Sequence, residues 1–281
     1  MSALARELVR AAPEVSSPPT VYQRLMAVIN HPRSGLADIA GVIAEDQGLT
    51  ARLLKVVNSA FFSFPQRIDS INQAVTVVGT SQIRDLALAT SVKALFEHVP
   101  EDLVDVDSFW YHSLACGVTA RVVANQRRES NVERFLVAGL LHDIGRLLIF
   151  LQMGDEARRA LHRARDERVP LFEAERDVLG CDHAEVGFVL LQEWNFPLAL
   201  QEAVKHHHRP ERASRYPVEV ATVHLADIVA HALRWGRSGE TRVPPLETAS
   251  WTHLGLEPWQ IPVILDDAER QLEASAHFLD A

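Results

Sequence analysis

The chain has 281 residues, 47% of them hydrophobic, and carries a formal net charge of −9. This length suffices for one large domain or two modest ones, and the acidic balance argues against nonspecific binding to nucleic acids or to anionic membranes. The first residues form no long apolar segment, and no window approaches about 18 uninterrupted apolar residues. We therefore expect neither a secretion signal nor a transmembrane helix, and we place the protein in the cytoplasm.

The first hundred residues have the apolar spacing of short helices. Prolines at positions 13, 18 and 19 disfavour a helix over residues 11–20. Residues 71–78 carry several β-branched side chains, but they alternate poorly for a strand, and Ser70 can cap a helix there. Thr50 is the expected cap of the third helix. Helices are expected over residues 21–31, 36–43, 51–59, 71–78 and 80–96.

An acidic segment at residues 100–107 is typical of a connector, and helical spacing resumes after it. Helices are expected over residues 109–126, 132–150, 153–168, 171–179, 183–193, 197–206, 217–233, 251–255 and 258–278. Convincing strands are almost absent, so we predict an all-α fold. We expect three parts, namely an N-terminal helical subdomain at 1–105, a core at 106–235 and a helical extension at 236–281.

His142 and Asp143 stand side by side after an apolar run, in the sequence GLLHDIGR of residues 139–146. Histidine offers a neutral nitrogen ligand and aspartate an anionic oxygen ligand. A carboxylate at the end of a buried segment is costly unless it is paired, and a divalent cation is one such partner. The pair is therefore a candidate metal-binding motif, although the same residues could simply cap a helix end.

Other residues have the character of ligands from distant helices. Asp227 lies inside the apolar sequence VHLADIV, where an unpaired carboxylate would be unusual. His112 could be an ordinary core histidine, and His183 could belong to a helix start capped by Asp182. The histidine run at 206–208 could be a solvated helix end. Successive side chains turn by about 100° around a helix, so His206 is expected to point away from its two neighbours' site.

The order of these residues resembles the HD superfamily of metal-dependent phosphohydrolases. The chain as a whole is similar to one branch, the HD-related output domain (HDOD), over roughly residues 15–235. Several motifs in the same order are more specific than a lone His-Asp pair. They are AEDQGLTARLLKVVNSA at 44–60, INQAV at 71–75, GLLHDIGR at 139–146, DHAEVG at 182–187, WNFP at 194–197 and HHRP at 207–210.

The resemblance implies a helical HD-type core packed on an N-terminal helical bundle, and a bacterial signalling role. In the related HD-GYP cyclic di-GMP phosphodiesterases, one metal takes a histidine, the His-Asp pair and a late aspartate. A second metal takes the same paired aspartate and three further histidines. The matching first set is His112, His142, Asp143 and Asp227. The matching second set is Asp143, His183, His207 and His208.

Two positions depart from the HD-GYP pattern. Arg146 stands where those enzymes have a lysine, and the Gly-Tyr-Pro signature after the paired histidines is absent. An arginine still holds phosphate well, so Asp143 and Arg146 are the candidate catalytic residues. The missing signature argues against hydrolysis of cyclic dinucleotides in particular.

Mixed histidine and carboxylate ligands suit Mn²⁺, Fe or Zn²⁺. Two such ions about 3.5–4 Å apart could polarise a phosphoryl oxygen and activate water. We expect a bacterial regulatory module that retains a divalent metal site, with one or two ions. The alternative is an active metal-dependent phosphohydrolase acting on a nucleotide or cyclic dinucleotide. The expected partner is a signalling protein or a small nucleotide, with no nucleic acid and no membrane.

Two further patterns have simpler interpretations. Residues 36–54 resemble a helix-turn-helix, but the segment is acidic, and a recognition helix should bring basic residues to phosphates. We therefore expect no binding to DNA there. Cys116 and Cys181 flank proposed ligands, yet small buried apolar residues explain both. His231 and the remaining histidines are expected to be ordinary core or surface residues.

Overall fold

The structure, a computed structural model, describes residues 2–58, 62, 64–96 and 98–275. Every regular element in this described part is a helix and none is a strand, so the predicted all-α class is confirmed. The chain forms two compact units. The larger unit consists of Met1–Ser17 and Phe96–Ala268, and the smaller one of Pro18–Leu95 and Glu269–Ala281.

These units do not coincide with the predicted boundaries at residues 105 and 235. The first helices, α1 (Ala3–Ala11) and α2 (Pro13–Ser16), belong to the larger unit because they are tied to α13 (His183–Glu193) and the turn after it. The Ser2 amide donates to Glu185 Oε1 at 2.6 Å, and Trp194 Nε1 donates to the carbonyl oxygen of Val15 at 3.0 Å. The segment after residue 235 also packs on the core, through buried Leu254 and Ile264.

The smaller unit is a bundle of short helices around buried aliphatic side chains. Its helices are α3 (Thr20–Ile29), α4 (Leu36–Ala44), α5 (Gln47–Val57), α6 (Ile71–Val78) and α7 (Thr80–Val92), followed by the 3-10 helix η1 (Lys93–Phe96). Ser70 Oγ accepts from the Gln73 amide at 3.3 Å, which confirms a helix over 71–78. The predicted start of α5 at residue 51 is wrong. Asp46 accepts from the Leu49 amide at 2.9 Å and begins the helix at Gln47.

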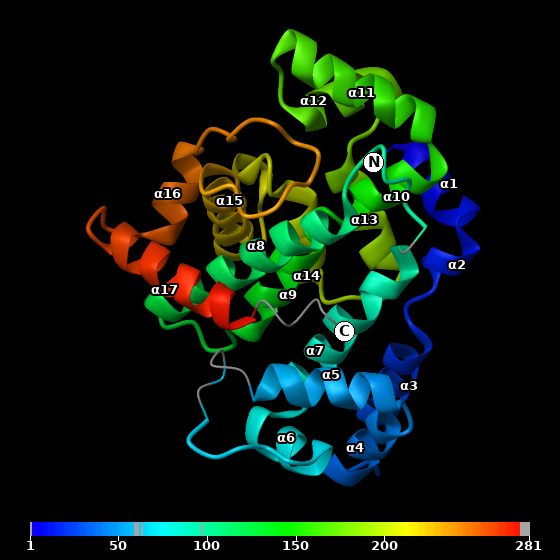
Figure 1. The fold of residues 1–281 in the computed structure, drawn as a ribbon, viewed down its shortest axis with the longest axis vertical. Helices are drawn as coiled ribbons and strands as arrows, with labels where there is room; N and C mark the ends of the chain where they lie inside the picture. Colours follow the sequence, from blue (N-terminus) through cyan, green and yellow to red (C-terminus); the bar gives the residue numbers. More distant parts are fainter. Residues whose placement is uncertain (1, 59–61, 63, 97, 276–281) are drawn as a thin grey trace. The chain divides into compact units, whose positions relative to one another are not determined.

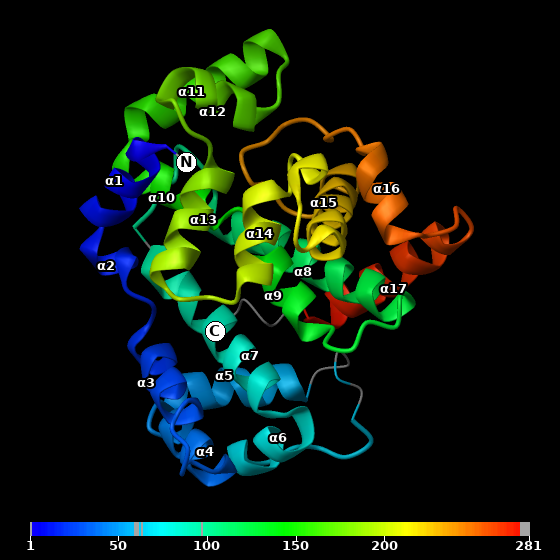
Figure 2. The same ribbon diagram turned by 180° about the vertical axis from the view of Figure 1, so that it is seen from behind.

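The larger unit is built around α8, which is buried along most of its length (Figure 1). Around it lie α9 and α15, and α13 and α14 lie side by side on the face seen in Figure 2. The helices of this part are α8 (Val106–Gln126), α9 (Glu133–Leu141), α10 (Ile144–Gln152), α11 (Gly154–Glu167), α12 (Leu171–Leu179), α13, α14 (Leu198–His206), the 3-10 helix η2 (Pro210–Arg212), α15 (Pro217–Ala232), α16 (Thr248–Leu254) and α17 (Gln260–Ser275).

Glycines allow two close helix crossings on either side of the His-Asp pair. A Cβ on Gly139 of α9 would lie 2.7 Å from the carbonyl oxygen of Cys116 on α8. A Cβ on Gly145 of α10 would lie 3.0 Å from Gly187 Cα on α13, and closer still to the His183 carbonyl oxygen. Only glycine permits such backbone contact. The two crossings therefore fix α8, α9, α10 and α13 around the pair.

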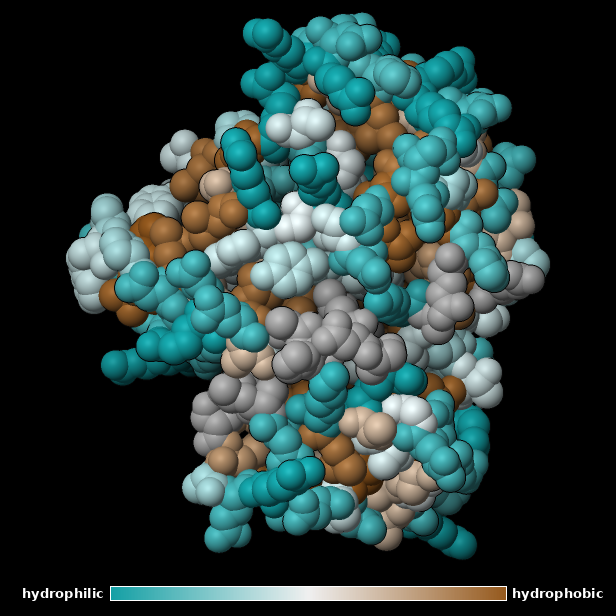
Figure 3. All heavy atoms as spheres, viewed as in Figure 1, coloured by the Kyte–Doolittle hydropathy of each residue, from teal (hydrophilic) through white to brown (hydrophobic). Residues whose placement is uncertain are grey.

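One helical stretch, Glu133–Gln152, is long and apolar enough to cross a membrane by composition alone. Within its most apolar window, 89% of the residues are buried inside the protein, as in a core helix of a globular unit. The α11–α12 pair, by contrast, presents mainly hydrophilic side chains on the face drawn in Figure 3. The charged side chains of α11 thus form a solvated surface.

Candidate metal centre

His142 and Asp143 lie in the break between α9 and α10. The first helix ends at Leu141 and the second begins at Ile144, and both side chains of the pair are buried. His142 Nδ1 donates to the carbonyl oxygen of Gly139 at 2.7 Å. This hydrogen bond orients the imidazole ring and leaves Nε2 as the atom available to a metal.

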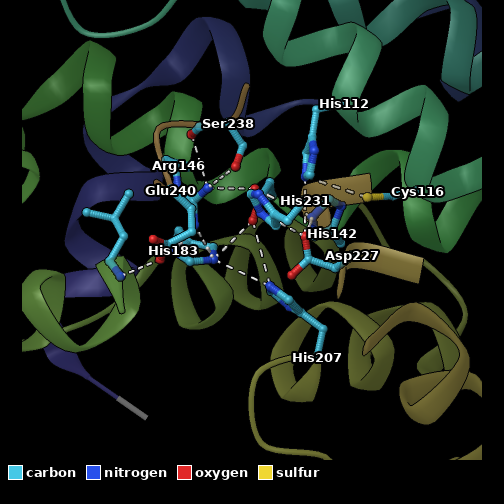
Figure 4. Close-up of polar contacts among 12 residues, drawn as sticks. His112, Cys116, His142, Arg146, His183, His207, Asp227, His231, Ser238 and Glu240 are labelled. Atoms are coloured by element: carbon cyan, nitrogen blue, oxygen red, sulfur yellow. Dashed lines mark hydrogen bonds and ion pairs between the residues drawn. The ribbon is translucent and has the colours of Figure 1, made fainter. Parts of the chain in front are cut away.

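Asp227, on α15, meets two of the predicted histidines. Asp227 Oδ1 is 3.3 Å from His112 Nε2 and 3.5 Å from His142 Nε2 (Figure 4). Cys116 lies one helical turn after His112 on α8, and its Sγ is 3.6 Å from His112 Nε2. One ligand atom from each of these four residues lies within 4.8 Å of the other three. We call His112, Cys116, His142 and Asp227 the first group.

Asp143 meets the remaining predicted histidines. Its Oδ1 is 3.0 Å from His183 Nε2 and 3.7 Å from His207 Nε2. His183 Nε2 is in turn 3.4 Å from His207 Nε2 and 2.9 Å from His208 Nε2. Ligand atoms of these four residues also lie within 4.8 Å of one another. We call Asp143, His183, His207 and His208 the second group.

Asp143 connects the two groups through its two carboxylate oxygens. Oδ1 faces the second group, while Oδ2 is 3.5 Å from His142 Nε2 of the first. The structure thus brings all seven predicted ligand residues together from five parts of the chain. The first group differs from the predicted first set of ligands in one respect. Cys116 completes the first group at close range, and Asp143 approaches that group only through Oδ2.

Several converging atoms are buried but make no aligned hydrogen bond. Within the described residues, His142 Nε2, Asp143 Oδ1 and Asp227 Oδ1 lack such a partner. Imidazole nitrogens nevertheless lie 3.0 to 3.5 Å from the two oxygens. Buried polar atoms without partners are costly. With metal–ligand bonds of about 2.0–2.1 Å, neighbouring ligands lie roughly 3.0–3.4 Å apart. The residues of both groups therefore fit divalent metal ions.

Burial and neighbouring charges set the protonation of the cluster. Burial opposes ionisation of Asp227, but three adjacent histidines outweigh it and hold the pKa of this carboxyl well below its usual range. Burial, followed by the charges of nearby histidines, lowers the pKa of His208 well below its ordinary value. Burial and the Arg146 charge oppose protonation of His183, yet two adjacent carboxylates raise its pKa to about 9. The cluster thus contains ionised carboxylates and, in His183, an imidazole whose proton a bound cation would replace.

Arg146, the second candidate catalytic residue, is buried with 1% exposure. Its Nη1 donates to Asp143 Oδ2 at 2.6 Å and to Ser238 Oγ at 2.8 Å. Its Nη2 lies 3.0 to 3.1 Å from the ring nitrogens of His183, and its Nε lies 3.4 Å from Glu175 Oε1. This guanidinium is a counter-ion that holds the carboxylate of Asp143. That Arg146 also binds phosphate stays a prediction from the sequence.

The structure adds residues that sequence reasoning missed. Glu175 Oε2 accepts from His183 Nδ1 at 2.5 Å and from the His183 amide at 2.9 Å, which directs Nε2 of that ring toward the second group. His231 Nε2 is 3.2 Å from Asp227 Oδ1. His231 and Cys116 each stand four residues after a predicted ligand on the same helix, so their spacing could have indicated them.

The other histidines near the centre have separate partners. His206 Nε2 lies 3.8 Å from Glu202 Oε2, and His206 is absent from both groups, as expected for the residue that points away. His224 is buried, with Nδ1 donating to the carbonyl oxygen of His207 at 2.6 Å and Nε2 accepting from the Glu247 amide at 3.1 Å. His224 is therefore a core histidine that supports the helix end carrying His207.

Comparisons with known proteins agree with this architecture. The family model described as "HDOD domain" matches residues 15–210. A protein of Treponema pallidum (strain Nichols), described as uncharacterised, is 25% identical over 241 residues, which cover 85% of this chain and 45% of that protein. The chain thus spans less than half the length of this relative.

Two solved structures share the fold over nearly the whole chain. An HDOD domain protein of unknown function from Geobacter sulfurreducens is 26% identical, covers 98% of this chain and 97% of its own, and superposes with a TM-score of 0.79. A protein of Shewanella amazonensis SB2B, named as a proposed phosphohydrolase, has a TM-score of 0.79 at 24% identity, with 99% and 98% coverage. At this identity the second likeness concerns the fold alone.

Proposed function

This chain belongs to the HDOD family, and we propose that it is a bacterial regulatory domain that holds two divalent metal ions. One observation carries the proposal. Two groups of ligand atoms, all from buried residues except the half-buried His208, adjoin one another through the carboxylate of Asp143, and the atoms of each group lie within 4.8 Å of one another. Packing of a helical core does not require such a cluster, because each unpaired buried polar atom destabilises the fold.

The first ion would be held by His112, His142 and Asp227, with Cys116 or Asp143 Oδ2 as a further ligand. The second would be held by Asp143 Oδ1, His183, His207 and His208. Nitrogen and oxygen ligands suit Mn²⁺, Fe and Zn²⁺, and a thiolate at Cys116 would favour Zn²⁺ or Fe in the first group. Bound ions would supply Lewis-acid activation of a phosphoryl oxygen and of water.

The chain's own residues do the positioning. Glu175 and the carbonyl oxygens of Gly139 and Val204 each accept from an imidazole Nδ1, at 2.5, 2.7 and 2.6 Å respectively. These hydrogen bonds fix the tautomer that presents Nε2 to a metal. Such preorganisation suits an output module that signals by whether its ligand is bound. A signalling protein would receive this signal, or a small nucleotide would set it. No nucleic-acid partner is proposed.

Metal analysis of purified protein tests the proposal. Wild-type protein saturated with Mn²⁺ or Zn²⁺ and then desalted should retain two ions per chain by inductively coupled plasma mass spectrometry. Asp227→Asn should remove the ion of the first group and His183→Gln that of the second, each with an unchanged helical circular dichroism spectrum. His206→Gln is the matched control and should retain both ions. Fewer than one ion per wild-type chain would remove the metal centre from the proposal.

A second candidate function is hydrolysis of phosphate esters. The observation that favours it is the carboxylate of Asp143, whose two oxygens face different groups, as the bridging ligand of a two-metal site does. Protein loaded with Mn²⁺ should then cleave bis(p-nitrophenyl) phosphate or a mononucleotide, and Asp143→Asn should abolish turnover. If loaded wild-type protein cleaves neither these compounds nor cyclic dinucleotides, the hydrolytic function is excluded and only the regulatory role remains.

A further inference from the structure

A pocket with a volume of about 320 Å³ adjoins the second group on its outer side. It lies in the larger unit, between the start of α12 and the loop that joins α15 to α16. Its walls include Arg168, Phe172, His208, Glu240, Arg242 and Pro244. We call it the His208 pocket. Its volume lies at the lower end of the range of about 300–1,000 Å³ that is usual for small-molecule sites.

The imidazole of His208 separates this pocket from the candidate metal centre. On the inner side, His208 Nε2 is 2.9 Å from His183 Nε2 of the second group. On the outer side, the ring stacks on Phe172, with ring centroids 4.5 Å apart and planes inclined by 15°. A molecule in the pocket would therefore lie one ring's width from the second group.

Positive charge gathers around the pocket, in a chain whose net charge is −9. Arg168 and Arg242 line it, and neither guanidinium forms an ion pair with a carboxylate of the described residues. The guanidinium of Arg209 lies over the Phe172 ring, 5.4 Å from its centroid. The guanidinium groups of Arg168 and Arg242 would attract an anion in the pocket.

The acidic residue of the pocket does not neutralise these arginines by direct pairing. The Glu240 carboxylate accepts from the Leu171 amide at 2.6 Å, from the Thr241 amide at 2.7 Å and from the Arg242 amide at 2.9 Å. These bonds tie the loop to the start of α12 and keep Arg242 beside the pocket. The loop is held further by Ser238, whose hydroxyl accepts from Arg146 in the interior.

We propose that the His208 pocket binds an organic phosphate of about mononucleotide size, with Arg168 and Arg242 holding the phosphate. Guanidinium groups match phosphate oxygens in charge and geometry, and they hold such anions by charge-assisted hydrogen bonds. Phe172 and Pro244 supply apolar surface for the organic part of the ligand. The role of this pocket as a substrate or effector site rests on the proposed metal centre. Binding of the organic phosphate to the pocket does not depend on that centre.

Isothermal titration calorimetry with adenosine monophosphate, inorganic phosphate and adenosine tests this assignment. Adenosine monophosphate should bind wild-type protein, inorganic phosphate should bind more weakly, and adenosine should not bind measurably. The variant Arg168→Gln/Arg242→Gln should bind adenosine monophosphate at least about tenfold more weakly, since it loses two charge-assisted contacts. The control Arg10→Gln/Arg215→Gln removes two other exposed charges from the same unit and should bind as wild type does.

Metal content measured on the same samples separates this inference from the proposed function. Equal metal content in all variants, with binding lost only in Arg168→Gln/Arg242→Gln, supports the pocket. Absence of binding by wild-type protein, or equal binding by both double variants, overturns it even when two ions are present. Binding that depends on Arg168 and Arg242 in a protein without metal would retain the pocket and remove the metal centre.

Discussion

Asp227 Oδ1 lies 3.5 Å from His142 Nε2, although the two residues come from different helices far apart in the chain. This contact joins α15 to the break between α9 and α10, and the proposed first metal ion depends on it.

Glu175→Gln should weaken the second metal ion selectively. The carboxylate holds His183 through Nδ1 and through the backbone amide, so its loss frees the ring to rotate. Outer partners of this kind are worth roughly 10–100-fold in metal affinity. Competition titration against a fluorescent chelator should show this loss for one ion and not for the other. Glu173→Gln, an exposed position on the same helix, is the control. Equal affinities in all three proteins would contradict the assigned role.

Arg146→Ala should destabilise the fold strongly. The substitution leaves the buried carboxylates of Asp143 and Glu175 without their guanidinium partner. Breaking a buried ion pair by removal of one partner costs about 3–5 kcal/mol. Urea unfolding followed by circular dichroism measures the free energy of unfolding. Arg158→Ala, which breaks an exposed pair with Asp102, should change it little. Similar values for the two variants would show that Arg146 is not the counter-ion of the centre.

Gly145→Ala should destabilise the protein because α10 and α13 touch at this residue. The added Cβ would overlap the carbonyl oxygen of His183 and lie 3.0 Å from Gly187 Cα, so the helix that carries His183 must move. Overpacking of this kind costs about 1–3 kcal/mol. Gly41→Ala is the control, since nothing lies within 4 Å of its Cβ and alanine favours a helix by about 0.5–1 kcal/mol. Thermal unfolding should move in opposite directions for the two variants.

The stability of metal-free protein should fall as the pH rises from 7 to 9. The pKa of His183 is raised from its ordinary value of 6.5 to about 9, so the protonated ring stabilises the folded state fully below pH 6.5. That contribution is lost as the pH approaches 9. The melting temperature of chelator-treated wild-type protein should show this decline, and that of His183→Gln should show a smaller one. Metal-loaded protein should also lack it, because a coordinated imidazole has no proton to lose. A flat profile in the chelated wild type would contradict the assigned pKa.

The residues that meet in the two groups could be predicted from the sequence because their types are distinctive. Histidines and an aspartate such as Asp227 indicate a functional site when they occur in apolar sequence, even before the helices are placed. The helix over residues 71–78 could be predicted because Ser70 offers a cap to a segment that alternates too poorly for a strand. Local signals of this kind can be recognised from the sequence alone.

Partners that act through packing could not be predicted in the same way. Glu175 and Ser238 reach the centre only because α12 packs on α11 and α13 and the loop after α15 contacts Arg146 of α10. No short-range sequence pattern predicts those contacts. The attachment of the first helices to the larger unit depends likewise on a distant bond from Trp194 to Val15. A lone cysteine such as Cys116 is more often a small buried residue than a metal ligand, so its residue type alone does not place it in the first group.

Anomalous diffraction from crystals of metal-loaded protein, collected at the absorption edge of the bound metal, tests the central claim most directly. Two peaks are predicted, one beside Asp227 Oδ1 and one beside Asp143 Oδ1, separated by about 3.5–4 Å as in binuclear phosphohydrolases. No peak at these carboxylates, or metal found only at surface histidines, would contradict the account.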